Sequence, residues 1–155
     1  MRIRRFAPED AAACAELFYR AVREGAVEKY DEAQRTAWAP HVPNPEKFGA
    51  RLGAEICFVA EDNQKLEGFM SLTTKGHLSM AFVAPDRRGT GLTGQLYEEI
   101  LGIAKAAKLT RLTVHASHYA RSFFEKEGWE VVEKEEVDRD GILIPRFLMA
   151  ISLRD

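Results

Sequence analysis

The sequence predicts an α/β fold in which helices flank a mixed sheet, within a single domain over residues 1–155. Two observations support this class. Apolar residues switch between alternating and helical spacing in the order strand, helices, three strands, helix, strand, helix and a terminal hairpin. A chain of 155 residues with 46% hydrophobic and 30% charged residues also fits one globular domain. Because strands and helices do not alternate regularly, the sheet is expected to be mixed rather than parallel.

The first third of the chain combines a strand and an amphipathic helix with a less regular segment. A short strand is predicted over residues 3–6, and a helix begins after Pro8-Glu9-Asp10. The apolar positions of this helix keep helical spacing: Cys14, Leu17, Phe18, Ala21 and Val22. Residues 25–53 hold three prolines around one expected short helix over residues 31–39. Since this segment is too aromatic for a linker, we expect it to cover a cleft.

The rest of the chain alternates strand and helix signals and ends in a hairpin. Strands are expected at residues 56–61, 66–73, 78–84, 112–116, 130–137 and 142–153. Helical spacing predicts helices over residues 92–107 and 119–127. Turn signals at Asp62-Asn63 and Asp140-Gly141 join neighbouring strands. On the strand 78–84, strict alternation places one set of side chains on a single face: Leu78, Met80, Phe82 and Ala84.

Composition and charge exclude several classes of protein. With 22 basic and 24 acidic residues the net charge is -2, which argues against a nucleic acid as the partner of this protein. No apolar stretch is long enough for a membrane span or a signal peptide, so we expect a cytoplasmic protein without a membrane partner. Cys14 and Cys57 lie far apart and form no cluster with histidine, so they are expected to be buried thiols and no metal site is predicted.

A glycine-rich loop between a strand and a helix carries the strongest chemical signal. From Val83 to Leu96 the chain passes two arginines and three glycines before it enters the helix. Backbone N–H groups of such a loop, together with the helix N-terminus, favour a pyrophosphate. The segment also matches G-x-G-x-x-G, but no acidic residue follows the next strand to hold a ribose, which argues against dinucleotide binding. A plain strand-to-helix turn is the structural alternative.

Two blocks of sequence resemble the GNAT superfamily of N-acetyltransferases. Arg88-Gly-Thr-Gly-Leu-Thr93 is similar to its [Q/R]-x-x-G-x-[G/A] loop. Ala116-Ser-His-Tyr-Ala-Arg-Ser-Phe-Phe-Glu-Lys-Glu-Gly-Trp129 is similar to its second block, and Ile3 to Asp10 to its usual opening. Residues 30–38 and 139–149 further resemble the YafP-like branch. The resemblance covers nearly the whole chain.

The resemblance implies an acyl-CoA N-acyltransferase fold with a mostly antiparallel central sheet and two splayed parallel strands. Acetyl-CoA would be the cosubstrate and would lie between the strands 78–84 and 112–116. Its pantetheine arm and pyrophosphate would contact the following residues: Phe82, Val83, Arg88, Gly89, Thr90, Gly91, Leu92, Thr93, Ser117 and Phe124. The backbone N–H of Val83 would polarise the thioester carbonyl.

The resemblance also implies direct attack of a neutral amine on the thioester, which needs a base and a proton donor for the thiolate. The usual donor is a tyrosine, but Phe124 stands at its place, so Tyr119, Ser117 or water would have to replace it. The usual acid on the strand before the loop corresponds to Ser79, which cannot act as a base. We therefore expect His77 to be the base, ahead of His115 and His118, with a structural role as the alternative.

The acceptor is expected to be an amine of a small molecule or a peptide. Residues 25–53 should form its pocket, with Tyr30 and Trp38 as walls or as ordinary packing residues. Residues 125–140 hold eight acids and three bases, a balance of -5, which would attract a cationic amine or would simply be solvated. A non-catalytic acyl-CoA-binding module is the alternative function, and a homodimer is left open.

Overall fold

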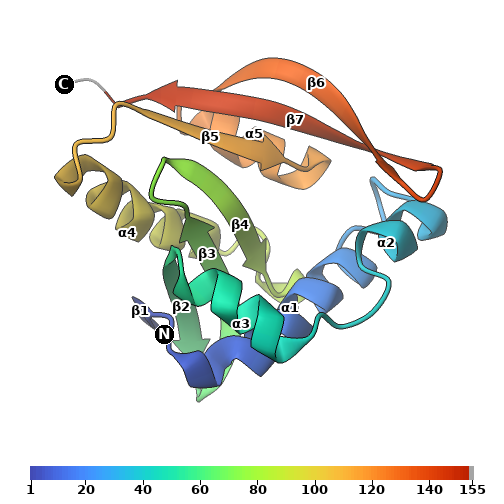
Figure 1. Cartoon of the computed structure of the whole chain (residues 1–155), viewed down its shortest axis with the longest axis horizontal. Coiled ribbons are helices and arrows are strands. Elements are labelled where there is room, and N and C mark those ends of the chain that lie inside the picture. The colour runs from blue at the N-terminus through green and yellow to red at the C-terminus, as the bar shows by residue number, and fades with distance from the viewer. Residues whose placement is uncertain (154–155) are drawn as a thin grey trace.

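The computed structural model describes residues 1–153 and contains one seven-stranded sheet (Figure 1). Its strand order is β1-β2-β3-β4-β5-β7-β6. The strands have these bounds: β1 Arg2–Arg5, β2 Ile56–Asp62, β3 Lys65–Leu72, β4 His77–Val83, β5 Arg111–Ala116, β6 Glu130–Arg139 and β7 Ile142–Ser152. All neighbouring strands are antiparallel except β4 and β5. The predicted mixed sheet is therefore confirmed.

The parallel pair β4–β5 is short, and the two strands separate soon after they meet. Only His77 with Thr113 and Leu78 with Val114 are paired across it. Beyond these residues the two strands diverge, as Figure 1 shows. The splayed parallel strands expected from the sequence are confirmed, and they leave the β5-facing edge of β4 without a strand partner.

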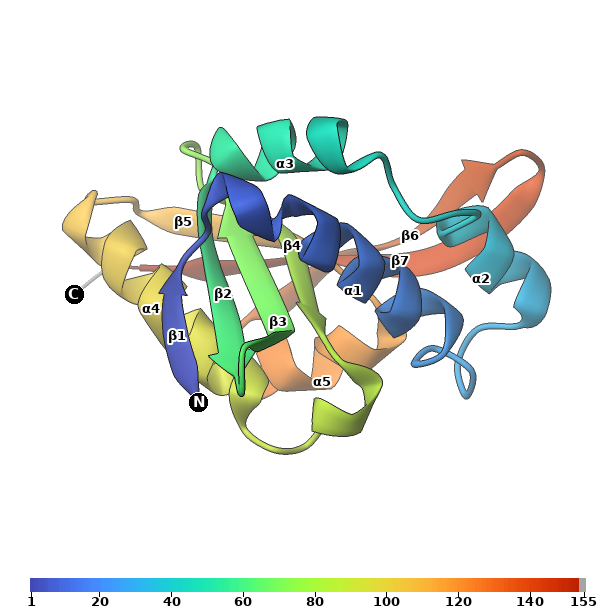
Figure 2. The ribbon, with the colours of Figure 1, turned by 90° about the horizontal axis from the view of Figure 1, so that it is seen from below.

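Helices cover both faces of the sheet (Figure 2). Their bounds are α1 Ala11–Arg23, α2 Glu32–Trp38, α3 Pro45–Gly53, α4 Leu92–Ala106 and α5 His118–Lys126, with 3₁₀ turns at Pro8–Asp10 and Pro85–Arg87. Helices α1 and α3 lie on one face, and α4 and α5 on the other. The sequence analysis described residues 25–53 as less regular and did not predict α3, although Asn44 caps this helix and Pro45 occupies its first turn. None of the helices within residues 1–153 has the length and apolarity needed to cross a bilayer.

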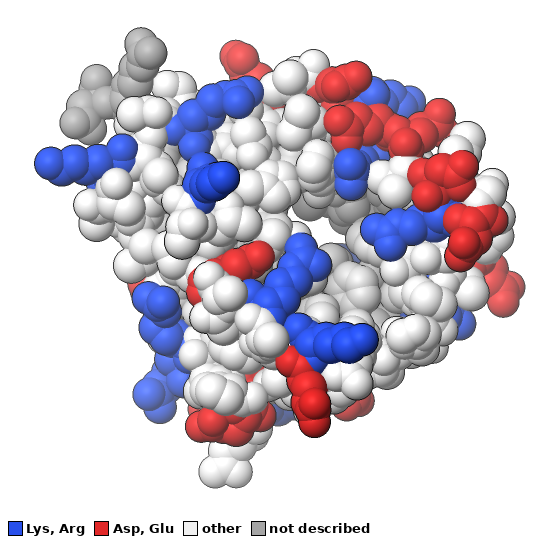
Figure 3. All heavy atoms as spheres, in the orientation of Figure 1, with Lys and Arg blue, Asp and Glu red and all other residues white. Residues whose placement is uncertain are grey.

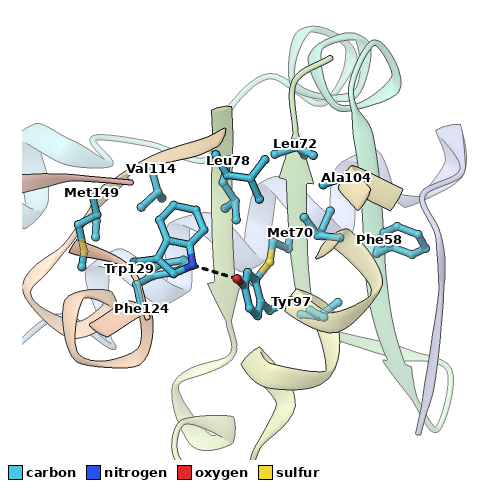
Figure 4. Close-up of a cluster of buried hydrophobic side chains, with 14 of the residues drawn as sticks. Phe58, Met70, Leu72, Leu78, Tyr97, Ala104, Val114, Phe124, Trp129 and Met149 are labelled. Carbon is cyan, nitrogen blue, oxygen red and sulfur yellow. Dashed lines mark hydrogen bonds between the residues drawn. The ribbon is translucent and has the colours of Figure 1, made fainter. Parts of the chain in front are cut away.

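Two apolar clusters, one on each face, hold the helices to the sheet. The cluster under α4 and α5 contains Tyr97, Phe124 and Trp129, and the Trp129 indole N–H donates to the Tyr97 hydroxyl at 2.9 Å (Figure 4). The cluster under α1 and α3 includes both cysteines, which are buried as the sequence predicted. Burial raises the pKa of the Cys14 thiol to about 12, so this thiol is not a nucleophile near neutral pH.

A β-bulge in β4 changes which side chains share a face. Ser71 pairs with Met80 and Leu72 with Leu78, so Ser79 is an extra residue without a partner on β3. An extra residue shifts the alternation by one position. Leu78 consequently joins the cluster under α4, while Met80 packs in the cluster under α1 and α3. The predicted single face shared by Leu78, Met80, Phe82 and Ala84 is therefore wrong.

Candidate active site

Two cavities meet where β4 and β5 diverge. One has a volume of about 380 Å³ and is lined by the glycine-rich loop, β4 and α5; we call it the loop cavity. The other has a volume of about 460 Å³ and is lined by residues of α1, α2, α3, β4, β5, β6 and β7; we call it the inner cavity. Trp38, Phe82 and Ser117 line both. A molecule that fills the loop cavity can therefore reach one that fills the inner cavity.

The glycine-rich loop leaves the first turn of α4 open toward the loop cavity. Gly89 and Gly91 have φ values of +74° and +90°, which L-residues rarely adopt, and an added Cβ at either would meet no atom within 4 Å. Within residues 1–153 no side chain caps the start of α4 or of α1, whereas α2, α3 and α5 are capped by Asp31, Asn44 and Ser117. Uncapped amide groups at a helix N-terminus provide a site for an anion.

The two arginines of this loop have different roles. Arg87 donates to Asp62 at 2.8 Å and lies 3.5 Å from the buried carboxylate of Glu67, which fixes the loop to β2 and β3. Arg88 instead lines the loop cavity, and its guanidinium carbon lies 4.0 Å from the centre of the Tyr119 ring. Only Arg88 of this pair is placed to meet a ligand in the loop cavity.

Most of the cofactor residues expected from the sequence surround the loop cavity. Its lining includes Phe82, Val83, Arg88, Gly89, Gly91, Thr93, Ser117 and Phe124. Thr90 and Leu92 are not among them. The backbone N–H and hydroxyl of Thr90 both donate to the carbonyl of Arg87, and the Leu92 side chain is buried in the core.

Ser117 and Tyr119 begin α5 at the junction of the two cavities. The Ser117 hydroxyl accepts from the Ala120 N–H at 3.2 Å, which leaves its own proton without an acceptor in residues 1–153. Tyr119 lines the loop cavity but not the inner cavity, and its hydroxyl accepts hydrogen bonds from the N–H groups of Glu28 and Lys29 at 2.9 and 3.0 Å. Of the two expected proton donors, Ser117 is the one that lies on both cavities.

His77 lies in the inner cavity at the start of β4. Its Nδ1 is 2.8 Å from the Thr113 hydroxyl, and its ring lies edge-on to His115 with centroids 4.9 Å apart. Burial, the charge of His115 and the nearby Arg146 and Arg51 lower the pKa of His77 below its ordinary value. His77 is therefore neutral near pH 7 and able to accept a proton.

The other two candidate histidines differ in their access to the cavities. His115 lines the inner cavity, and its Nε2 lies 3.6 Å from a Glu135 carboxylate oxygen. His118 lines neither cavity, and its backbone N–H donates to the buried Tyr30 hydroxyl at 2.9 Å. Burial lowers the pKa of both imidazoles. The structure thus brings His77 and His115 together and leaves His118 outside.

The sequence analysis missed Glu55, an acidic residue beside the inner cavity. The bulge turns the Ser79 hydroxyl toward the Glu55 carboxylate, which accepts its hydrogen bond, and toward Ser71 at 2.8 Å. The negative charge of Glu55 also acts on His77 and opposes the lowering of its pKa. The sequence contained no signal for this contact, because Glu55 precedes β2 and follows no motif.

Aromatic side chains close the inner cavity from the α2 side. Tyr30 is 2% exposed, and its hydroxyl donates to the Pro145 carbonyl at 3.1 Å. Trp38 packs edge-on against Tyr30, with ring centroids 5.3 Å apart, and its ring is tilted against that of Phe82, with centroids 6.3 Å apart. Both residues line the inner cavity, so the segment over residues 25–53 forms one of its walls.

Comparison with known proteins identifies relatives along most of the chain. Residues 26–151 match the family model of the acetyltransferase (GNAT) domain. The chain is 28% identical to the N-acetyltransferase YafP of Escherichia coli K12, over 96% of this chain and 94% of YafP. It is 33% identical to the peptidyl-lysine N-acetyltransferase YjaB of Salmonella typhimurium, over 57% of this chain and 59% of YjaB.

Solved structures show the same architecture. A GCN5-related N-acetyltransferase from Rhodopseudomonas palustris is 32% identical, with a TM-score of 0.91 over 98% of this chain and 95% of that one. The acetyltransferase YncA of Salmonella typhimurium, solved with acetyl-CoA, is 17% identical, with a TM-score of 0.77 over 100% of this chain and 95% of that one. The sequence resemblance is confirmed: the chain belongs to the GNAT family of acetyltransferases and is similar to YafP.

Proposed function

We propose that the protein transfers the acetyl group of acetyl-CoA to a primary amine by direct attack, with the two substrates in the two cavities. As a member of the GNAT family it is an acetyltransferase with acetyl-CoA as its cosubstrate. Our proposal adds to this activity that the acceptor is a primary amine and that the amine attacks the thioester directly. The single observation that carries them is the junction of the cavities at Trp38, Phe82 and Ser117.

The loop cavity fits the cosubstrate. The pyrophosphate would lie on the amide groups at Gly89, Gly91 and the first turn of α4, where positive partial charges meet an anion. The pantetheine arm would follow the edge of β4 that β5 leaves unpaired, so that its amide groups hydrogen-bond as those of an added strand would. The thioester would then reach the junction, close to Phe82 and Val83.

The chemistry at the junction needs a base that takes a proton from the amine and a hydrogen-bond donor that stabilises the departing thiolate. His77 would take a proton from the attacking amine, directly or through one water, since it is neutral and lies in the inner cavity. The Ser117 hydroxyl would donate a hydrogen bond to the departing thiolate, because its proton has no acceptor among the described residues. Phe124 offers no proton at the place of the usual tyrosine.

Release of CoA thiol from acetyl-CoA in the presence of a panel of amines tests this function. The panel should include a lysine peptide, because one relative is named a peptidyl-lysine N-acetyltransferase. Turnover with at least one amine, with the acetyl group found on nitrogen, supports the proposal. Tight binding of acetyl-CoA without turnover on any amine would instead favour the non-catalytic binding module.

Replacement of His77 tests the proposed base. Loss of a general base lowers kcat/KM by about a hundred- to ten-thousand-fold. We expect this drop for His77→Gln, with loss of the acidic limb of the pH profile, whereas His118→Gln outside both cavities should retain the limb. A rate within a factor of a few of wild type and an unchanged limb in His77→Gln would assign His77 a structural role.

A further inference from the structure

The inner cavity has a one-sided charge. Its charged lining side chains are all guanidinium groups, from Arg51 on α3, Arg139 on β6 and Arg146 on β7. No Asp or Glu within residues 1–153 lines it. In Figure 3 the surface is hollowed near its centre with blue Lys and Arg side chains at its border, while red acidic side chains gather toward β6. A cavity lined in this way favours a negative group in its occupant.

Carboxylates outside the cavity neutralise only part of this charge. Glu135 accepts a hydrogen bond from Arg146 Nε at 2.9 Å, and Glu55 lies 3.8 Å from Arg51 Nε. Both distances are to Nε, and the terminal nitrogens of the two groups form no hydrogen bond with a described residue. The Arg139 side chain makes no hydrogen bond or ion pair with any residue of 1–153. Donors of three arginines are therefore left for a ligand.

The arginines lie near the proposed base. The charges of Arg146 and Arg51 both act on His77, so both guanidinium groups are within electrostatic range of its imidazole. A ligand with an anionic group at these arginines would have its other end near His77 and the junction of the cavities. Such a ligand would be oriented as well as bound, because guanidinium binds carboxylate and phosphate in a fixed, bidentate geometry.

We propose that the acceptor is a small primary amine that also carries a carboxylate or phosphate group, and that Arg51, Arg139 and Arg146 bind this group. The proposal rests on the acetyl transfer proposed for the same site. A volume of about 460 Å³ is that of a small-molecule site. The acidic residues of β6 do not change this preference, because the carboxylates stay outside the cavity.

Pairs of amines that differ only in the anionic group test the proposal. At saturating acetyl-CoA, an amino acid is compared with its amide, and an aminoalkyl phosphate with the corresponding amino alcohol. A charge-assisted hydrogen bond corresponds to roughly a ten- to hundredfold change, so we expect kcat/KM to favour the anionic member by at least about tenfold. The pair with the larger ratio tells whether carboxylate or phosphate is preferred. Equal rates within both pairs, or a preference for the neutral members, would overturn the proposal.

Variants locate the effect in the cavity. Arg139→Gln is the cleanest change, because Arg139 has no carboxylate partner within residues 1–153 that its removal would leave unpaired. We expect it to raise KM for the anionic amine about tenfold and to leave the neutral amine unchanged. Arg2→Gln, at an exposed site on β1, is the matched control and should leave KM unchanged for both the anionic and the neutral amine. Equal weakening of both amines in Arg139→Gln would contradict the assignment.

A binding measurement separates this inference from the proposed acetyl transfer. Calorimetric titration of the CoA-bound protein with succinate, which has carboxylates but no amine, should show binding that Arg139→Gln weakens and Arg2→Gln retains. If no amine is acetylated while succinate still binds in this pattern, the proposed reaction fails and the anion site stands. If amines are acetylated but succinate does not bind, the reaction stands and the anion site is refuted.

Discussion

Gly91 allows backbone strain to be separated from cofactor binding. Its φ is +90° at the start of α4, and an added Cβ would meet no protein atom within 4 Å. Gly141, in the turn between β6 and β7, has a φ of +86° and equally open surroundings. The two glycines therefore impose the same local conformation, but only Gly91 lines the loop cavity.

The matched pair Gly91→Leu and Gly141→Leu should consequently lose similar stability and differ in CoA affinity. An L-residue in the left-handed region costs roughly 1–2 kcal/mol, which corresponds to a fall in Tm of about 2–8 °C for a chain of this size. The leucine at position 91 would in addition occupy the pyrophosphate site. Each charge-assisted hydrogen bond lost there weakens binding by roughly ten- to a hundredfold.

Thermal unfolding and calorimetry with CoA measure the two effects. We expect both variants to melt at similar temperatures below wild type, with weakened CoA binding in Gly91→Leu only. CoA affinity within a factor of two of wild type in Gly91→Leu would refute the phosphate site at this loop. An equal loss of affinity in Gly141→Leu would show that general destabilisation, rather than occlusion, explains the result.

Two further predictions concern the start of α5 and the response to acid. Ser117→Ala should lower the free energy of unfolding by about 1 kcal/mol and should also lower kcat. Ser117→Asn should retain the helix cap and the stability. Equal unfolding midpoints in urea for the wild type and both variants would contradict the capping role. His77, His115 and His118 have lowered pKa values when folded, so the unfolded chain binds more protons; stability should be full above the ordinary value of 6.5 and be lost as the pH falls from there through the lowered folded values. Urea unfolding at several pH values measures this loss of stability. A free energy of unfolding that rises as the pH falls through that range would contradict the prediction.

The predictable parts of the fold are those that local pattern determines. The hairpin at Asp140-Gly141 and the helix over residues 92–107 have turn and spacing signals that need no partner, and both are confirmed. The bulge at Ser79 was not predictable, because it depends on how β4 registers with β3. Helix α3 was missed although its cap and proline were visible, because a nine-residue helix with two buried apolar side chains, Phe48 and Leu52, gives a weak spacing signal.

The residues of the candidate site likewise differ in whether the sequence alone could identify them. Much of the lining of the loop cavity comes from the two sequence blocks at residues 88–93 and 116–129, so residues such as Gly91 and Ser117 could be named from the sequence. The inner cavity is assembled from α1, α2, α3, β4, β5, β6 and β7, and its residues have no common motif. The arginines at positions 51, 139 and 146 lie far apart in the chain, and only the fold brings them to one cavity.

Because of the bulge, β4 holds one residue more than its pairing with β3 uses. Because Ser79 is the extra residue, His77, Met80 and Phe82 all line the inner cavity, whereas Ala81 and Val83 line the loop cavity. A plain strand of the same sequence would put His77 on the face opposite Met80 and Phe82, whereas an in-frame deletion of Ser79 would remove the bulge and keep all three on one face. In a gene coding for this strand, loss of the Ser79 codon would therefore preserve the face that lines the inner cavity and remove the hydroxyl that contacts Glu55 and Ser71.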